Sequence, residues 1–199
     1  MQNTSVLMTG IGGQGIILAS DILADTALRM CWDVKKTDAI GMAQRGGSVV
    51  SHIRMGKTIY SPLISEGGAD ILLGMEKLEA ARSHRFLITG GKVLINKYCS
   101  PPLSSSGNEV AYPGDDAILS LFEQQGAEVF FIDGLEKVEK LGNTRTLNIF
   151  LLGALSVLLP FSREAWEESI RSKLPFKIID INLEAFSLGR EAVENAGIS

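Results

Sequence analysis

The residues best suited to chemistry in this chain are the glycines of a short loop near its start. Gly10, Gly12 and Gly15 have the G-x-G-x-x-G spacing, which gives βα loops a tight turn, a close backbone approach to phosphate and close helix–strand packing. Gly13 and Gln14 extend this to the rarer pattern G-x-G-G-Q-G. Free N–H groups at the start of the following helix would favour an anion. The loop therefore predicts either a phosphate site or a tightly packed turn.

A second glycine-rich segment carries an arginine. The planar guanidinium of Arg45, beside exposed glycine N–H groups, can bind a phosphate or a carboxylate, although alone the segment would be a solvated turn. We expect both segments near the carboxyl ends of adjacent strands, the edge where ligands bind in open α/β sheets. Together they predict one binding site with nine members: Gly10, Gly12, Gly13, Gln14, Gly15, Gln44, Arg45, Gly46 and Gly47.

Asp38 is the candidate for a nucleotide ribose. It follows Gly15 by 23 residues, close to the roughly 20 at which dinucleotide-binding folds place a ribose-binding acid. However, the Lys35-Lys36 pair and the glycine-rich continuation do not resemble a dehydrogenase. We therefore favour a strand-end or capping role for Asp38.

The remaining polar candidates have structural interpretations. His52 is predicted to be a packed or exposed strand residue rather than a general base. Three glutamates, Glu66, Glu76 and Glu79, are interpreted as surface or capping carboxylates. No nucleophile–base pair or metal-binding spacing is found in the sequence, so no residue is assigned a catalytic role.

Alternating strands and helices must position these loops. Strands are predicted at residues 5–9, 33–38, 48–54, 69–74, 92–96 and 128–132, with a turn at 55–57 leading into a hairpin strand at 58–61. Helices are predicted at residues 16–30, 76–85, 115–125, 135–140, 144–159, 163–173 and 182–196. This order indicates a single α/β domain over residues 1–199. We expect a Rossmann-like, doubly wound, mostly parallel sheet with a β-hairpin insertion and C-terminal helices.

Composition excludes several classes of function. The net charge of −4 gives no support for nucleic-acid binding, which needs a basic face. Cys31 and Cys99 form no C-x-x-C pair for a metal, cluster or redox site. The apolar run at 147–159 is shorter than the ~20 residues of a membrane span, so it predicts a helix covered by its own domain or by another subunit. The absence of a charged leader indicates a cytoplasmic protein.

Several motifs in order resemble one known family. Residues 10–15, the run GMAQRGGSVVSHIR at 41–54, YSP at 60–62 and NIFLLGA at 148–154 are similar to the gamma-type domain of 2-oxoacid:ferredoxin oxidoreductases. The similarity covers nearly the whole chain. Within the family, AQRGG at 43–47 most resembles the beta subunits of the indolepyruvate branch.

The resemblance implies a thiamine diphosphate-dependent decarboxylation of an aryl 2-oxoacid that yields acyl-CoA, carbon dioxide and reduced ferredoxin. The chain has neither the G-D-G…N motif for diphosphate and magnesium nor the cysteine motif of iron–sulfur clusters. Thiamine diphosphate, magnesium and the clusters would then lie on a larger partner subunit, with coenzyme A as co-substrate. This chain would complete an active-site or CoA-facing cleft, and the isolated chain could pair with a second copy.

Two other classes remain open at this point. A free-standing Rossmann-like nucleotide-binding protein would use Asp38, and a structural scaffold would use the glycines for packing alone.

Overall fold

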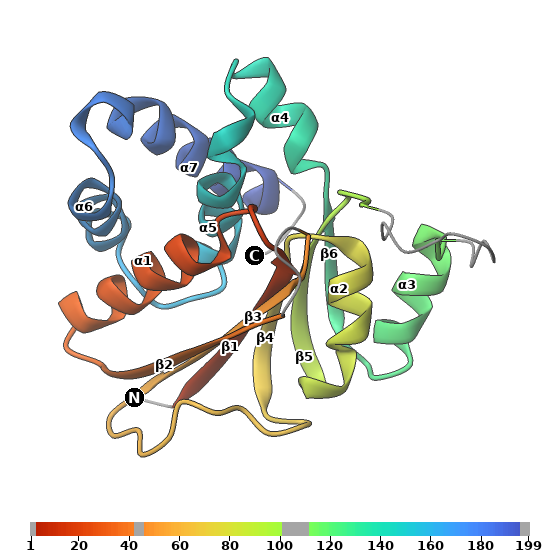
Figure 1. Cartoon of the computed structure of the whole chain (residues 1–199). Coiled ribbons are helices and arrows are strands. Elements are labelled where there is room, and N and C mark those ends of the chain that lie inside the picture. Colours follow the sequence, from red (N-terminus) through yellow and green to blue (C-terminus); the bar gives the residue numbers. More distant parts are fainter. Residues whose placement is uncertain (1–2, 42–45, 101–111, 196–199) are drawn as a thin grey trace.

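The chain is built around a six-stranded sheet with helices on both faces (Figure 1). The computed structural model describes residues 3–41, 46–100 and 112–195. The strands are β1 (Thr4–Ile11), β2 (Asp33–Ile40), β3 (Ser48–Gly56), β4 (Ala69–Gly74), β5 (Leu87–Asn96) and β6 (Glu128–Ile132). The helices are α1 (Ile16–Arg29), α2 (Lys77–Arg82), α3 (Asp115–Glu123), α4 (Gly134–Lys140), α5 (Leu147–Ser156), α6 (Arg163–Lys173) and α7 (Ile179–Glu194).

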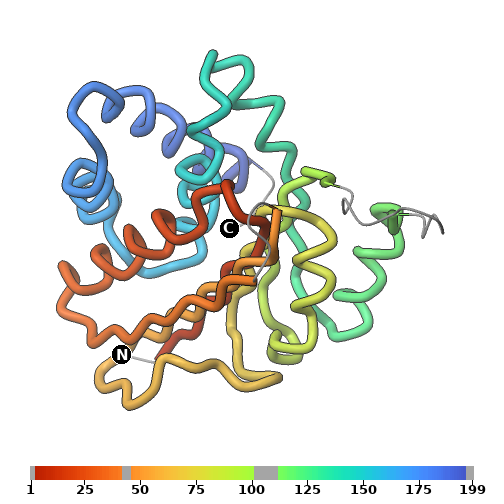
Figure 2. Tube along the Cα trace, viewed as in Figure 1, coloured from red at the N-terminus to blue at the C-terminus, as the bar shows by residue number. Residues whose placement is uncertain are grey.

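The sheet is mixed, in the order β2-β3-β1-β4-β5-β6. Strands β1, β4, β5 and β6 are parallel, whereas β3 runs antiparallel to both β1 and β2. The expected α/β fold with a predominantly parallel sheet and helices on both faces is confirmed. The antiparallel ribbon β2–β3 occupies one side of the sheet, and the colour ramp of the tube places it beside the N-terminal strand (Figure 2).

Alternation along the strands divides the interior into two cores. Val6 and Met8 of β1 face a large cluster with helices α1, α5, α6 and α7, while Leu7 faces a smaller cluster with α2 and α3. This follows from the two-residue period of a strand, which sends successive side chains to opposite faces. The sheet therefore packs against helices on both faces.

Helix α5 is an interior helix. All of its residues from Asn148 to Ser156 are buried, as expected for a helix that is apolar on every side. Gly153 of α5 and Gly189 of α7 let the two backbones approach closely, since a Cβ at either position would overlap a main-chain carbonyl of the other helix. Of the two interpretations of this apolar run, coverage within its own domain is confirmed. None of the helices in the described part of the chain has the length and hydropathy that a bilayer crossing requires.

The predicted hairpin at residues 48–61 is wrong. Residues 58–61 form no strand, and β3 instead forms its antiparallel ribbon with β2. Side chains, not a partner strand, accept the N–H groups of the segment after β3: Ile59 donates to Asp33 at 2.7 Å and Ile64 donates to His52 at 3.2 Å. Pro62 has no N–H to donate.

Several helix boundaries also differ from the prediction, and the helix expected at 144–159 is a 3₁₀ turn, Thr144–Thr146, followed by α5. The helix expected at 76–85 ends at Arg82 and continues as a separate 3₁₀ turn, His84–Phe86. Helix α7 begins at Ile179 rather than at residue 182. Strands β4 and β6 and helix α6 have the predicted bounds, and the Ser162 hydroxyl caps α6 by accepting from the Ala165 N–H.

Candidate functional site at the glycine loop

The glycine loop joins the end of β1 to the start of α1. Gly13 has φ +102° and Gly15, the N-cap of α1, has φ +77°, both in the left-handed region that favours glycine. The Gln14 N–H donates to the Ile11 carbonyl at 3.2 Å, which closes the turn. The first N–H groups of α1, from Ile16 to Leu18, have no acceptor among the described residues. They give the loop the partial positive charge of a helix N-terminus.

The second glycine segment lies against the first, but not at the carboxyl ends of adjacent strands as expected, because Gly46 and Gly47 precede the start of β3 and β3 separates β2 from β1. The Gly12 N–H donates to the Gly47 carbonyl at 2.8 Å. The two segments meet because β3 is antiparallel to β1, which sets Ser48 at the start of β3 opposite Ile11 at the end of β1. Gln44 and Arg45 lie outside the described residues.

Both ends of the Gln14 side chain form hydrogen bonds within the chain. Its Oε1 accepts from the Ile11 N–H at 2.8 Å, and its Nε2 donates to the Met75 carbonyl at 3.3 Å. Across the loop, Nδ2 of Asn148 at the start of α5 donates to the Gly15 carbonyl at 3.3 Å. Asn148 was not predicted as a site residue from sequence, because 133 positions separate it from Gly15. Its place at the head of NIFLLGA was the one available signal.

An open cavity of about 330 Å³ adjoins the glycine loop. The exposed guanidinium of Arg145 makes no ion pair within the described ranges. Tyr98 and Thr144 add hydroxyl groups, and sequence reasoning missed all three residues. The cavity is lined by Gly13, Gln14, Tyr98, Leu135, Thr144, Arg145, Leu147 and Asn148. Its chemistry suits an anionic group joined to a partly apolar one.

The carboxylate of Asp38 is bound by side chains of β2 and β3. Its carboxylate accepts from the Ser51 hydroxyl at 2.6 Å and pairs with Lys36 at 3.0 Å. Strand β3 separates β2 from β1. Asp38 on β2 therefore lies two strand spacings, about 10 Å, from β1, the strand that leads into the glycine loop. A dinucleotide fold requires these two strands to be neighbours. The structural interpretation of Asp38 therefore fits this sheet.

His52 is a packed strand residue, as predicted. Its Nδ1 accepts from the Ile64 N–H at 3.2 Å, and its ring stands edge-on to Phe86 with centroids 5.8 Å apart. Burial lowers the pKa of His52, against a smaller opposing effect of Asp38. The ring is thus kept neutral, as an acceptor for a backbone N–H must be.

Glu76 caps α2, as predicted, but it is not a surface residue. It is 1% exposed and accepts from the Glu79 N–H at 2.8 Å, from the Ser100 N–H at 3.2 Å and from the Tyr112 hydroxyl. Burial and the bond to Glu76 raise the pKa of Tyr112 well above its usual value. Glu79 is also buried and pairs with Arg82 at 2.6 Å, whereas the exposed Glu66 pairs with Arg85 at 3.2 Å.

The described residues do not form a metal centre. No group of three or more His, Cys, Asp or Glu side chains in these ranges could hold an ion. The whole sequence contains two cysteines, fewer than the four thiolates that hold an iron–sulfur cluster.

Solved structures define the class of fold. The gamma subunit of keto/oxoacid ferredoxin oxidoreductase from Geobacter sulfurreducens matches with a TM-score of 0.73 at 22% identity, over 96% of this chain and 99% of that one. The 2-oxoglutarate:ferredoxin oxidoreductase of Magnetococcus marinus matches at 0.79 and 18% identity, over 100% of this chain and 32% of that one. The fold is that of oxoacid:ferredoxin oxidoreductase gamma subunits.

The sequence comparisons establish the family. The family described as pyruvate ferredoxin/flavodoxin oxidoreductase matches residues 5–192. "Indolepyruvate oxidoreductase subunit IorB" of Thermococcus kodakarensis is 36% identical over 197 residues, 98% of each chain, and its namesake in Archaeoglobus fulgidus is 36% identical over 187 residues, 93% of this chain and 92% of that one. The chain belongs to the pyruvate ferredoxin/flavodoxin oxidoreductase family. It is a small oxidoreductase subunit of the 2-oxoacid:ferredoxin type.

Proposed function

We propose that this subunit serves an indolepyruvate or related aryl-pyruvate:ferredoxin oxidoreductase, and that its glycine loop faces coenzyme A in a cleft shared with a larger subunit. The main support is the open backbone of the loop. A Cβ at Gly13 would meet no atom within 4 Å, and one at Gly12 would meet only the Gly47 segment, at 3.7 Å or more. Among the described residues, Gly13 therefore has no neighbour and Gly12 has only ordinary contacts, which supports the approach of an external group to this backbone.

The chemistry of the lining favours an anion carried on a larger molecule. The N-terminus of α1 and the guanidinium of Arg145 both favour negative charge, while Leu135 and Leu147 offer apolar contact. A phosphate-bearing thiol such as coenzyme A has both features. Arg45 would add a second guanidinium from the neighbouring glycine segment, with Gln44 beside it.

The redox cofactors are assigned to the partner subunit. The sequence has neither the G-D-G…N motif nor the cysteine motif of a cluster, and the described residues form no metal-binding group, which supports placing those cofactors on the partner. The contribution of this chain is to bind and orient the co-substrate and to exclude water from one side of the cleft. Electrons would leave to ferredoxin through the complex, in the cytoplasm.

A free-standing nucleotide-binding protein is the less favoured function. It would require Asp38 to reach a ribose at the glycine loop, and the hydroxyl of Ser51 and the ammonium of Lys36 already occupy that carboxylate.

The test is reconstitution with the large subunit and the variant Gly12→Ala. The nearest atom to the new Cβ is the Gly47 carbonyl oxygen at 3.7 Å, an ordinary contact, so the isolated variant should fold with wild-type stability. In the complex it should raise KM for coenzyme A by about tenfold or more, because it displaces a group that approaches the backbone. Gly114→Ala, at another open glycine with φ −65°, is the matched control. Wild-type KM and kcat for Gly12→Ala would overturn the proposal.

Arg45 has its own test in the same assay. Arg45→Lys keeps the charge and loses the planar fork, so it should restore only part of the activity lost in Arg45→Ala. Comparison of KM for coenzyme A with KM for the 2-oxoacid identifies the ligand that Arg45 contacts. Unchanged kinetics in Arg45→Ala would remove Arg45 from the site.

A further inference from the structure

Three amide side chains lie at or beside the glycine loop. Gln14 and Asn148 form hydrogen bonds with the loop itself, and Asn96 binds the Met75 carbonyl that Gln14 also binds. We propose that Gln14, Asn96 and Asn148 are positioning residues that hold the loop in its binding shape, while ligand contact is made by the loop backbone. The inference rests on the proposed function in one respect, that the loop faces a ligand.

Gln14 fastens the loop to the end of β4. Its Oε1 accepts from the Ile11 N–H at the end of β1, and its Nε2 donates to the Met75 carbonyl, just after β4. A Cβ on Gly10 would clash with Gln14 Oε1. The first glycine of the G-x-G-x-x-G pattern therefore makes room for an amide of the chain itself.

The Met75 carbonyl is a shared junction. It accepts from Gln14 Nε2 and from Nδ2 of Asn96, each at 3.3 Å, while the Met75 N–H donates to the Thr9 carbonyl at 2.8 Å. Asn96 Oδ1 in turn accepts from the N–H of Gly134, the first residue of α4, at 3.1 Å. Asn96 is fully buried. The ends of β1, β4 and β5 and the start of α4 are thus connected through two amides.

Asn148 fastens the other side of the loop. It is 6% exposed and donates from Nδ2 to the Gly15 carbonyl. A Cβ on Gly15 would stand 2.5 Å from that Nδ2. The last glycine of the pattern therefore also makes room for an amide of the chain. Of the two inner glycines, Gly13 has no described atom within 4 Å of its Cβ position, and Gly12 has only ordinary contacts with Gly46 and Gly47.

Gln14 and Asn96 each donate and accept at once, which only an amide side chain of their shape can do, whereas Asn148 acts as a donor to the Gly15 carbonyl. Gln14 accepts at Oε1 and donates at Nε2, and a carboxylate of the same shape cannot donate. Since both ends of Gln14 are engaged within the chain, its side chain acts on a ligand only through the loop that it holds.

The test uses Gln14→Glu and Asn148→Asp, which preserve shape and remove the donor. Asn182→Asp is the matched control: Asn182 is 5% exposed and donates to the Ile178 carbonyl at 2.7 Å, in α7. Gln14→Met removes the same hydrogen bonds without adding a charge, so it controls for effects of the new charge in Gln14→Glu. Far-ultraviolet circular dichroism of the full chain verifies folding of each variant.

Two measurements distinguish the positioning role of these amides from the proposed binding of coenzyme A. Hydrogen exchange of the isolated chain should be about fivefold faster at the Gly12 and Gln14 amides in all three loop variants, as expected for the loss of one hydrogen bond, and unchanged there in Asn182→Asp. In the reconstituted enzyme, KM for coenzyme A should rise by about tenfold with a smaller change in kcat. Wild-type exchange at both amides in the folded loop variants would overturn the inference. Faster exchange with unchanged KM would support the positioning role and overturn the proposed CoA-facing function.

Discussion

The four glycines between Gly10 and Gly15 are required for different physical reasons. Gly10 and Gly15 are enclosed by side chains of the chain itself, whereas the space beside Gly13 is open. The sequence motif does not distinguish these cases. The side chain beside Gly10 is that of Gln14, and the side chain beside Gly15 is that of Asn148, which is distant in sequence.

Gly15→Ala should destabilise the isolated chain more than a positive φ alone explains. A left-handed alanine costs ~1–2 kcal/mol, and at Gly15 the clash with Asn148 adds to this cost. Gly126→Ala is the matched control, since Gly126 has φ +68° with no atom within 4 Å of its Cβ position. Urea denaturation should show a loss of ~3 kcal/mol for Gly15→Ala against ~1 kcal/mol for Gly126→Ala. Equal losses would contradict an enclosed Gly15.

Acid should destabilise the segment that follows β3 through His52. The folded-state pKa of His52 lies below its unfolded value, because burial disfavours the imidazolium. The unfolded chain therefore binds more protons, and the stabilisation is complete above the unfolded pKa of about 6.5 and is lost as the pH falls below it. Thermal unfolding of the wild type should show a drop in Tm between pH 7.5 and pH 5.5 that His52→Gln lacks. A parallel drop in both proteins would assign the effect to other groups.

Among the elements, the order and the bounds of β4, β6 and α6 could be predicted from sequence, whereas the pairing could not. Local patterns are sufficient for the strand at Ala69–Gly74 and for the helix capped by Ser162, where the relevant residues are adjacent. The hairpin prediction failed because residues 58–61 resemble a strand in composition but donate to side chains of earlier strands. The proximity of the two glycine segments was expected from sequence, but its cause, the antiparallel pairing of β3 with β1, was not. The cavity depends on Tyr98 and Arg145, which lie far apart in sequence and have no motif.

The contact between α5 and α7 should be the least tolerant of added volume. A Cβ at Gly153 would overlap the Phe186 carbonyl oxygen, which cannot move without shifting the α7 backbone. Gly153→Ala should cost ~3 kcal/mol or more, at the upper end of overpacking. Urea denaturation measures this, with Ala154→Gly as a control for the change of helix propensity at a neighbouring position. A Gly153→Ala chain of wild-type stability would show that the helices can separate at little cost.

At the scale of the whole molecule, the isolated chain should be catalytically silent. Its two cysteines are fewer than the four thiolates that hold an iron–sulfur cluster, and its described side chains form no metal-binding group. Dye reduction dependent on a 2-oxoacid should appear only when the large subunit is added, together with its iron and thiamine diphosphate. Turnover by this chain alone, free of partner by mass spectrometry, would contradict the assignment.

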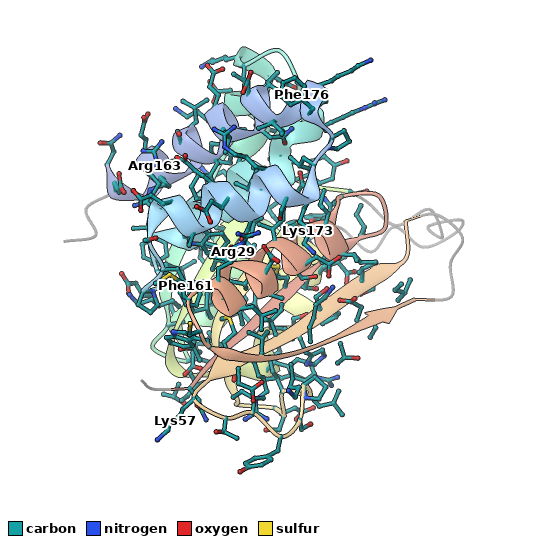
Figure 3. The ribbon with its side chains drawn as sticks, turned by 90° about the vertical axis from the view of Figure 1, so that its left-hand side faces the viewer. Arg29, Lys57, Phe161, Arg163, Lys173 and Phe176 are labelled. Atoms are coloured by element: carbon teal, nitrogen blue, oxygen red, sulfur yellow. The ribbon has the colours of Figure 1, made fainter. Side chains whose placement is uncertain are left out.

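The exposed apolar side chains lie at separate places on the molecule. Phe176, 91% exposed, follows α6, while Tyr60, 93% exposed, lies in the segment after β3. Figure 3 shows Phe176 at one end of the molecule and Lys57, which begins that segment, at the other. The buried α5 offers no surface for pairing of the isolated chain. Pairing and the organisation of residues 1–199 as one domain both stay predictions.

The antiparallel ribbon also has a consequence for the order of folding. Strands β2 and β3 are close in sequence and pair locally, whereas β1 must close a loop of more than thirty residues to reach β3. Local pairs form before distant ones because they lose less loop-closure entropy. The hydrogen bond from Gly12 to Gly47 then forms only when the finished ribbon docks on β1. The glycine loop of a nascent chain would therefore reach its final shape late, after the ribbon has docked on β1.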